Sequence, residues 1–266
     1  MRARISLMIA SAAVLAITMV SCGKKEKEDE GASAPAATSS TPAPAVDTAS
    51  AGSVSGTVKL EGPAPKPHRI NMAADAYCNS QHAGGATDQE VVVSSNGDIA
   101  NVVIYVKDGI GDRKFDAPKE GATLDQKGCM YTPHVVAMMA GQELIVINSD
   151  KTTHNIHPTP KVNRDWNKSQ SAGQPNIVET FPREEVSIPV KCNIHPWMKS
   201  YIAVFKHPYF GVTGNNGSFD IKNLPPGTYT LEAWHEKFGA SDQTVTIGAK
   251  EAKNITFTFK AAGGAD

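Results

Sequence analysis

The sequence predicts an all-β protein, and three observations support this. Short segments rich in Val, Ile, Thr and Tyr recur from residue 53 onward. Gly, Pro, Asn and Asp separate these segments, and no long stretch keeps a helical period. Many short strands divided by such turns are typical of a β-sandwich or a β-barrel.

Ten segments carry this pattern in chain order. They are "SVSGTVKL" at 53–60, "VVVSS" at 91–95, "ANVVIYVKD" at 100–108, "QELIVINSD" at 142–150, "EVSIPVKC" at 185–192, "YIAVFKH" at 201–207, "GSFDI" at 217–221, "GTYTLEAW" at 227–234, "QTVTIG" at 243–248 and "NITFTF" at 254–259.

The first residues predict export. A basic "MRAR" precedes the apolar "ISLMIASAAVLAITMV", which is too short for a comfortable membrane span and ends at "VSCG" before the charged "KKEKEDE". Ser21 before Cys22 is similar to a bacterial lipoprotein cleavage site, although Met19 stands where leucine is usual. The resemblance implies a signal peptide at 1–21 and a lipidated Cys22. Ordinary signal cleavage nearby is the alternative.

The resemblance also implies where the protein resides. Acyl chains on Cys22 would hold it to a bacterial membrane, facing the periplasm or the cell exterior, because their methylenes are buried in lipid. Residues 22–52 have no aromatic side chain and are mostly charged residues followed by Ala, Ser, Thr and Pro. We therefore expect this range to be a flexible tether.

Charge argues against nucleic acid as a partner. The chain has 26 Lys and Arg against 27 Asp and Glu, a net charge of −1. Loss of residues 1–21 removes Arg2 and Arg4, so the charge becomes 24 − 27 = −3. No basic cluster remains to neutralise phosphates. Roughly 210 residues remain after the tether, enough for one large or two small domains.

The C-terminal sequence "FGVTGNNGSFDIKNLPPGTYTLEAWHEKFG", followed by "QTVTIGAKEAKNITFTF", resembles a carboxypeptidase regulatory-like domain, a small transthyretin-like sandwich. "NNG" is a hairpin turn that needs positive φ, and "LPPGTY" is a turn that leads into a strand. The first strands of that family are similar to "SGTVKLEG" and "ANVVIYV" near the start of the chain. The resemblance implies a discontinuous sandwich, 53–117 plus 207–262, with a second domain inserted. Two domains in tandem are the alternative.

The inserted domain is expected at residues 118–206. Here "YTPHVVAMMAGQELIVINSDKTTHNIH" and the later "VETFPREEVSIPVKCNIHPWMKSYIAVF" resemble a cupredoxin, the amicyanin/plastocyanin-like blue-copper domain. The final loop reads Cys-x-x-His-Pro-x-Met, and 192 − 154 = 38 residues separate its cysteine from the upstream histidine. The resemblance implies a Greek-key β-sandwich that holds one mononuclear type 1 copper.

The cupredoxin resemblance implies a set of four ligands. His154 and His195 would supply imidazoles, Cys192 a thiolate and Met198 a weak axial thioether. Taken singly, the cysteine and the methionine would be ordinary core residues, and His154 a surface or capping residue. Together, at these spacings, they favour copper.

Three neighbours of the ligands receive roles from the same resemblance. Asn155 is expected to hydrogen-bond near the thiolate, which would tune the metal. Pro196 and Trp197 are expected to form an apolar rim beside His195, where redox partners dock.

Alternation along residues 185–192 predicts which way the thiol points. In a regular strand Val186, Ile188, Val190 and Cys192 would share one face, directed inward. Pro189 falls on the other face and indicates a sheet edge or a bulge.

The remaining cysteines predict a disulfide. With Cys22 acylated, three thiols remain in an oxidising compartment, and we expect Cys78 to pair with Cys129. Cys192 is then the odd thiol, and metal ligation would protect it from oxidation.

Zinc is the competing interpretation of these cysteines. The spacing C-x3-H and C-x4-H would use Cys78, His82, Cys129 and His134. Cys129 and His134 have opposite parity along a strand, which disfavours this site. Three further histidines remain open between packing, surface and site-rim roles: His157, His207 and His235.

Electron transfer is the function we expect. Four filled ligand positions leave no place for a substrate, and no nucleophile elbow, zinc-protease helix or phosphate loop is present in the sequence. The partners would be redox proteins such as a cytochrome c or a dehydrogenase, in transient contact. Copper storage or delivery, a carbohydrate- or surface-binding module using "AWHEKF", and a copper enzyme in which Met198 is not a ligand are the alternatives.

Overall fold

The computed structural model describes residues 49–261. Within this range the chain consists of β-strands with one short helix, α1 (Ala76–Gln81), so the all-β prediction is confirmed. The predicted signal peptide, Cys22 and most of the tether lie outside the described residues. None of the helical structure between residues 49 and 261 is long and apolar enough to cross a membrane.

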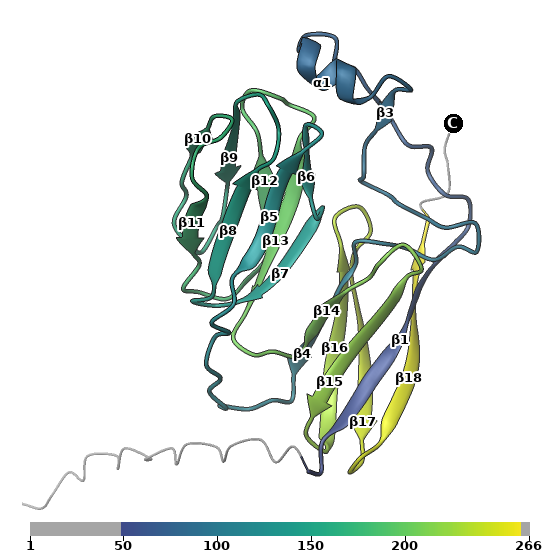
Figure 1. The fold of residues 1–266 in the computed structure, drawn as a ribbon. Helices are drawn as coiled ribbons and strands as arrows, with labels where there is room; N and C mark the ends of the chain where they lie inside the picture. The colour runs from purple at the N-terminus through teal and green to yellow at the C-terminus, as the bar shows by residue number, and fades with distance from the viewer. Residues whose placement is uncertain (1–48, 262–266) are drawn as a thin grey trace, which may run out of the picture. The chain divides into compact units, whose positions relative to one another are not determined.

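The first sandwich joins the two ends of the described chain. One sheet has the order β15-β1-β18 and the other β14-β4-β16-β17. In Figure 1 the blue β1 lies directly beside the yellow β18, and the two strands pair in parallel. The bounds are β1 (Gly52–Glu61), β4 (Val103–Asp108), β14 (Phe210–Val212), β15 (Ser218–Leu224), β16 (Gly227–His235), β17 (Gly239–Ile247) and β18 (Ala252–Lys260).

The pairing of β1 with β18 depends on a glycine. Side chains of β1 alternate between buried and half-buried, which places Val54 and Val58 in the core between the sheets. A Cβ added at Gly56 would lie 1.9 Å from the backbone oxygen of Ile255. Only glycine therefore fits at this close approach.

The second sandwich contains the strands between β4 and β14. Its sheets have the orders β10-β9-β12-β13-β7 and β11-β8-β5-β6, with parallel pairs β13·β7 and β5·β8. The bounds are β5 (Ala122–Lys127), β6 (Met130–Thr132), β7 (Val135–Met139), β8 (Glu143–Asn148), β9 (His154–Pro158), β10 (Lys168–Gln170), β11 (Ile177–Thr180), β12 (Glu185–Lys191) and β13 (Lys199–Phe205).

A bulge interrupts β12. Ser187 has a φ of 66°, and the register with β13 shifts between Glu185 and Ile188. Ile188 consequently packs in the core of the second sandwich, whereas Val186 packs in a separate cluster. The prediction that Val186 shares a face with Ile188 was wrong, because the bulge reverses the alternation. Pro189 is exposed, as the alternation indicated.

The chain between β1 and β4 forms a small separate element. β2 (Arg69–Ile70) pairs with β3 (Ala86–Thr87), and α1 lies between them in sequence. From this segment Met72 and Cys78 are buried in the core of the second sandwich. The segment thus packs on the second sandwich, although the sequence analysis assigned the whole range 53–117 to the first sandwich.

The prediction of a strand at residues 91–95 was wrong. Only Val93 forms an isolated bridge there, with Ile99. The hydroxyl of Ser94 accepts hydrogen bonds from the backbone of Asn96 and of Asp98, which folds these residues into a turn. A short valine run followed by a polar turn therefore had no partner strand.

A third cluster connects residues of both sandwiches. Val103 and Tyr105 of β4 pack with Val135, Ala203 and Phe205 from β7 and β13. The rings of Tyr105 and Phe205 are 4.7 Å apart between centroids.

Candidate metal centre

The loop between β12 and β13 carries three of the predicted ligands and closes on itself. The backbone N–H of Cys192 donates to the carbonyl of Met198 at 3.2 Å, and the N–H of Met198 donates to that of His195 at 2.9 Å. Cys192 and His195 are each 2% exposed and Met198 is 0% exposed. The loop thus turns all three side chains away from solvent.

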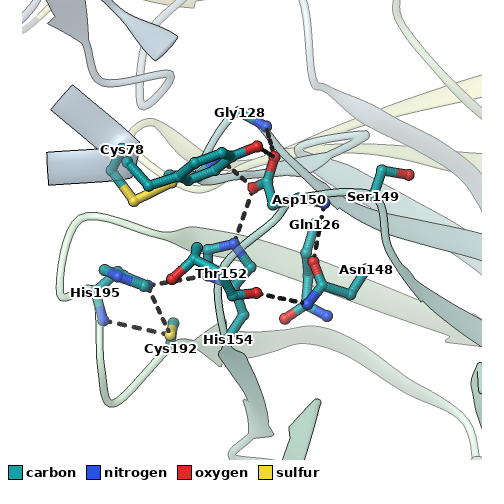
Figure 2. Close-up of polar contacts among 12 residues, drawn as sticks. Cys78, Gln126, Gly128, Asn148, Ser149, Asp150, Thr152, His154, Cys192 and His195 are labelled. Atoms are coloured by element: carbon teal, nitrogen blue, oxygen red, sulfur yellow. Dashed lines mark hydrogen bonds and ion pairs between the residues drawn. A yellow bond between two sulfur atoms is a disulfide. The ribbon is translucent and has the colours of Figure 1, made fainter. Parts of the chain in front are cut away.

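His154 meets this loop from the start of β9. It is fully buried, and β10 holds its backbone by pairing it with Gln170. Its Nδ1 lies 2.9 Å from Nδ1 of His195, whose Nδ1 is 3.8 Å from Sγ of Cys192. Ligand atoms of the three residues lie within 4.8 Å of one another. Figure 2 draws the three side chains together.

Asp150 holds the His154 ring from the far side. His154 Nε2 donates to its carboxylate at 2.8 Å, and the backbone N–H groups of Gly128 and Cys129 donate at 2.7 Å each (Figure 2). The hydroxyl of Tyr77 also donates, at 3.2 Å. Burial alone would raise the pKa of Asp150, but the hydrogen bonds from His154, Cys129 and Gly128 outweigh it and lower the pKa below its usual value.

Asp75 holds the His195 ring in the same way. Asp75 is the N-cap of α1, where its side chain accepts from the backbone N–H of Cys78 at 2.8 Å. His195 Nε2 donates to its other carboxylate oxygen at 3.2 Å. Both histidines therefore use Nε2 on a carboxylate and direct Nδ1 toward Cys192.

The thiol and the imidazole shift each other's ionisation. Burial opposes ionisation of Cys192, but a hydrogen bond from His154 and backbone N–H donors, including that of His195, lower its pKa. Burial likewise opposes protonation of His154, but Asp150 and Cys192 raise its pKa to about 9. The cluster thus favours a thiolate.

The three neighbours named from the sequence lie close to the cluster. The Asn155 side chain accepts from the backbone N–H of Asn193, one residue after Cys192. Pro196 is exposed. The half-buried Trp197 places its ring 5.2 Å from that of His195 and donates its Nε1–H to the carbonyl of Cys129 at 3.1 Å.

Cys78 and Cys129 form a disulfide, which confirms the predicted pairing. The zinc interpretation is therefore wrong, because sulfurs bonded to each other are not thiolate ligands. His82 contacts the carbonyl of Gly128 through Nε2, and His134 pairs with Glu236. Neither histidine joins the cysteines in a metal cluster among the described residues.

The three open histidines have separate environments. His157 is half-buried near the loop, with Nδ1 3.3 Å from the Asn193 side chain. His207 is buried and donates from Nε2 to the carbonyl of Val106. His235 is fully buried and stacks on Phe238, 4.8 Å away.

The donor set fits copper. Two imidazole nitrogens and one thiolate sulfur converge in a dry site, and soft sulfur with imidazole is the combination that blue-copper sites use. In each ring the second nitrogen is already engaged, which fixes the ring orientation. Figure 2 shows Cys192, His154 and His195 facing one another below Asp150 and the disulfide.

Three residues of this centre escaped the sequence analysis: Asp75, Tyr77 and Asp150. Asp150 is the last residue of a predicted strand and lies four residues before His154. This short separation was the sequence feature that could have indicated a contact between the two side chains. Asp75 meets a ring 120 residues away, and nothing local in the sequence indicated this contact.

Comparisons with known proteins found one family and several solved structures that are similar to parts of this chain. A family profile for the carboxypeptidase regulatory-like domain matches residues 203–260. A search of curated proteins found no match.

Several solved structures are similar to part of the chain. A purple cupredoxin from Nitrosopumilus maritimus is 20% identical over 31% of this chain and 98% of its own, at a TM-score of 0.27. A reduced amicyanin mutant is 17% identical over 38% and 97%, at 0.29. A copper-containing nitrite reductase from Thermus scotoductus SA-01 is 19% identical over 37%, at 0.31, and this chain spans only 25% of its length. At these TM-scores the similarity supports no conclusion about function.

Proposed function

We propose that this chain is a type 1 copper protein that carries single electrons between redox partners outside the cytoplasm, held to a membrane by lipid on Cys22. The observation that supports the proposal is the convergence of His154, Cys192 and His195 in a buried cluster. Copper, when bound, supplies a one-electron couple. His154 and His195 would hold it through Nδ1, Cys192 through its thiolate and Met198 through its thioether.

The residues around the cluster suit this role. Asp150 fixes the His154 ring through Nε2 and is itself held by two backbone N–H groups. A ring that cannot turn keeps its ligand nitrogen in place, so little rearrangement accompanies a change of charge at the centre. Burial of Cys192 and Met198 keeps water away from both sulfurs.

We further propose an electron carrier rather than an enzyme. With the four side chains as ligands, no coordination position is left for a substrate. Redox proteins such as a cytochrome c or a dehydrogenase would dock on exposed apolar residues of the ligand loop, Ile194 (50% exposed) and Pro196. A small apolar contact suits a transient partner, and the absence of a basic cluster from the sequence disfavours nucleic acid.

The test is spectroscopic. The full chain loaded with Cu(II) is expected to show an intense thiolate-to-copper absorption band and a type 1 EPR signal, and both should disappear in Cys192→Ser. His157→Asn is the matched control, because His157 lies beside the loop but outside the cluster. A wild-type protein that binds Cu(II) without the thiolate band would contradict the proposal.

Redox behaviour separates transport of electrons from transport of copper. An electron carrier is expected to cycle reversibly between Cu(I) and Cu(II) with a cytochrome c while it retains the metal. Rapid release of Cu(I) to an acceptor protein, with poor reversibility, would favour storage or delivery instead.

A further inference from the structure

The segment between β2 and β3 lies against the edge of the candidate metal centre. We propose that α1 and its N-cap Asp75 form a latched cover: the Asp75 carboxylate positions His195, and the Cys78–Cys129 disulfide holds Asp75 in place. This inference deepens the proposed function and rests on the same cluster. Asp75 is a positioning residue, since it acts on the metal through His195.

The carboxylate of Asp75 is fixed at both oxygens. Oδ1 accepts from the backbone N–H of Cys78 at 2.8 Å, and Oδ2 accepts from Nε2 of His195 at 3.2 Å. The helix cap and the histidine contact therefore depend on one side chain. With Oδ2 on Nε2, the Nδ1 atom of His195 remains the one directed at the cluster.

The disulfide lies between the two carboxylate–histidine pairs. Sγ of Cys78 is within 4.8 Å of ligand atoms of Asp75 and His195, and Sγ of Cys129 is within 4.8 Å of those of Asp150 and His154. Both sulfurs belong to fully buried residues. The bond joins residues 51 positions apart, so it attaches α1 to the turn before β6.

Three kinds of noncovalent contact also hold the cover. Met72 and Cys78 enter the core of the second sandwich, the hydroxyl of Tyr77 donates to Asp150, and Nε2 of His82 contacts the carbonyl of Gly128. A helix of six residues is not stable by itself, so tertiary contacts must keep α1 folded. Breaking the disulfide should therefore loosen Asp75, and loosening Asp75 should release the His195 ring.

The first experiment uses the metal-free full chain and iodoacetamide, with alkylation of Cys192 followed by site-resolved mass spectrometry. Asp75→Asn keeps a good helix cap but places an amide group against His195 Nε2. Loss of that hydrogen bond is expected to speed alkylation about tenfold. Asp88→Asn is the control, because Asp88 pairs with the exposed His68, whereas the carboxylate on His195 Nε2 is that of Asp75.

The second experiment opens the latch. Treatment of wild type with a thiol reductant, which converts the disulfide to two thiols as the reductant becomes a disulfide, is expected to speed Cys192 alkylation at least as much as Asp75→Asn. Cys78→Ser with Cys129→Ser should reproduce this without free thiols at the latch. If circular dichroism shows that reduction unfolds the protein, the alkylation rate of Asp75→Asn alone tests the inference.

A third measurement tests positioning directly. The ¹⁵N NMR resonance of His195 Nε2 is expected to shift in Asp75→Asn and to stay unchanged in Asp88→Asn. If Asp75 only stabilised the fold, a variant with an unchanged melting temperature would leave this resonance unchanged as well. Unchanged alkylation together with an unchanged resonance would overturn the inference. Because all three measurements use metal-free protein, they can fail while copper binding succeeds, or succeed while it fails.

Discussion

At the scale of single residues, the two histidines of the centre share one arrangement. Each directs Nδ1 toward Cys192 and donates from Nε2 to an aspartate, Asp150 for His154 and Asp75 for His195. Because an imidazole can present only one nitrogen to a metal at a time, the carboxylate on the other nitrogen decides which one. The aspartates thus belong to the site as much as the ligands do.

Met198 is a proposed ligand that does not belong to the observed His154, Cys192 and His195 cluster, and its role can be tested against an internal control. Met138 is equally buried in the same core. Exchange of either methionine for leucine should cost less than about 1.5 kcal/mol of unfolding free energy, because volume is conserved. Only Met198→Leu should raise the reduction potential, because loss of the thioether donor disfavours Cu(II). Cyclic voltammetry measures this, and equal potentials in both variants would remove Met198 from the ligand set.

At the scale of elements, one covalent bond attaches α1 to the turn before β6. The Cys78–Cys129 bond closes a segment of 51 residues. Its removal in the double serine variant should lower the unfolding free energy by about 4 kcal/mol, since the unfolded chain regains the entropy of that loop. Urea denaturation measures the loss. A change below about 1 kcal/mol would mean that the loop is already constrained by other contacts.

The sequence predicted the β class, the disulfide and most strands because these are recorded locally, in alternation, turn residues and cysteine number. It failed where tertiary structure decides. Residues 91–95 have strand propensity but no partner strand. α1 has fewer than two turns and so shows no helical period. The bulge at Ser187 reversed the orientation expected for Val186, which only the register with β13 reveals.

At the scale of the whole molecule, side chains of both sandwiches pack together. Tyr105 of β4 contacts Phe205 of β13, and Glu236, which follows β16, pairs with the buried His134 that precedes β7. Burial of these groups in shared clusters should couple the two cores, so that they unfold in one transition. The boundaries 53–117 and 207–262 for the discontinuous sandwich, and 118–206 for the inserted domain, remain a prediction.

His235, next to Glu236, should make this junction sensitive to acid. Its Nε2 is buried without a hydrogen-bond partner, and its Nδ1 accepts from the backbone N–H of Lys237. Burial, reinforced by the nearby His134, lowers the pKa of His235 to about 4 from 6.5. Below pH 6.5 His235 therefore binds a proton in the unfolded chain but stays neutral in the folded chain. The free energy of unfolding consequently falls as the pH is lowered to about 4.

The expected loss between pH 7 and pH 5 is about 2 kcal/mol from this residue alone. His235→Phe should lose some stability at pH 7, because the backbone N–H of Lys237 loses its acceptor, yet it should be less sensitive to acid than wild type. Urea denaturation of both proteins at the two pH values isolates the histidine, since all other titrating groups are shared. His68→Asn on the surface is the control. If His235→Phe and wild type lose equal stability between pH 7 and pH 5, protonation of this ring is not what weakens the molecule in acid.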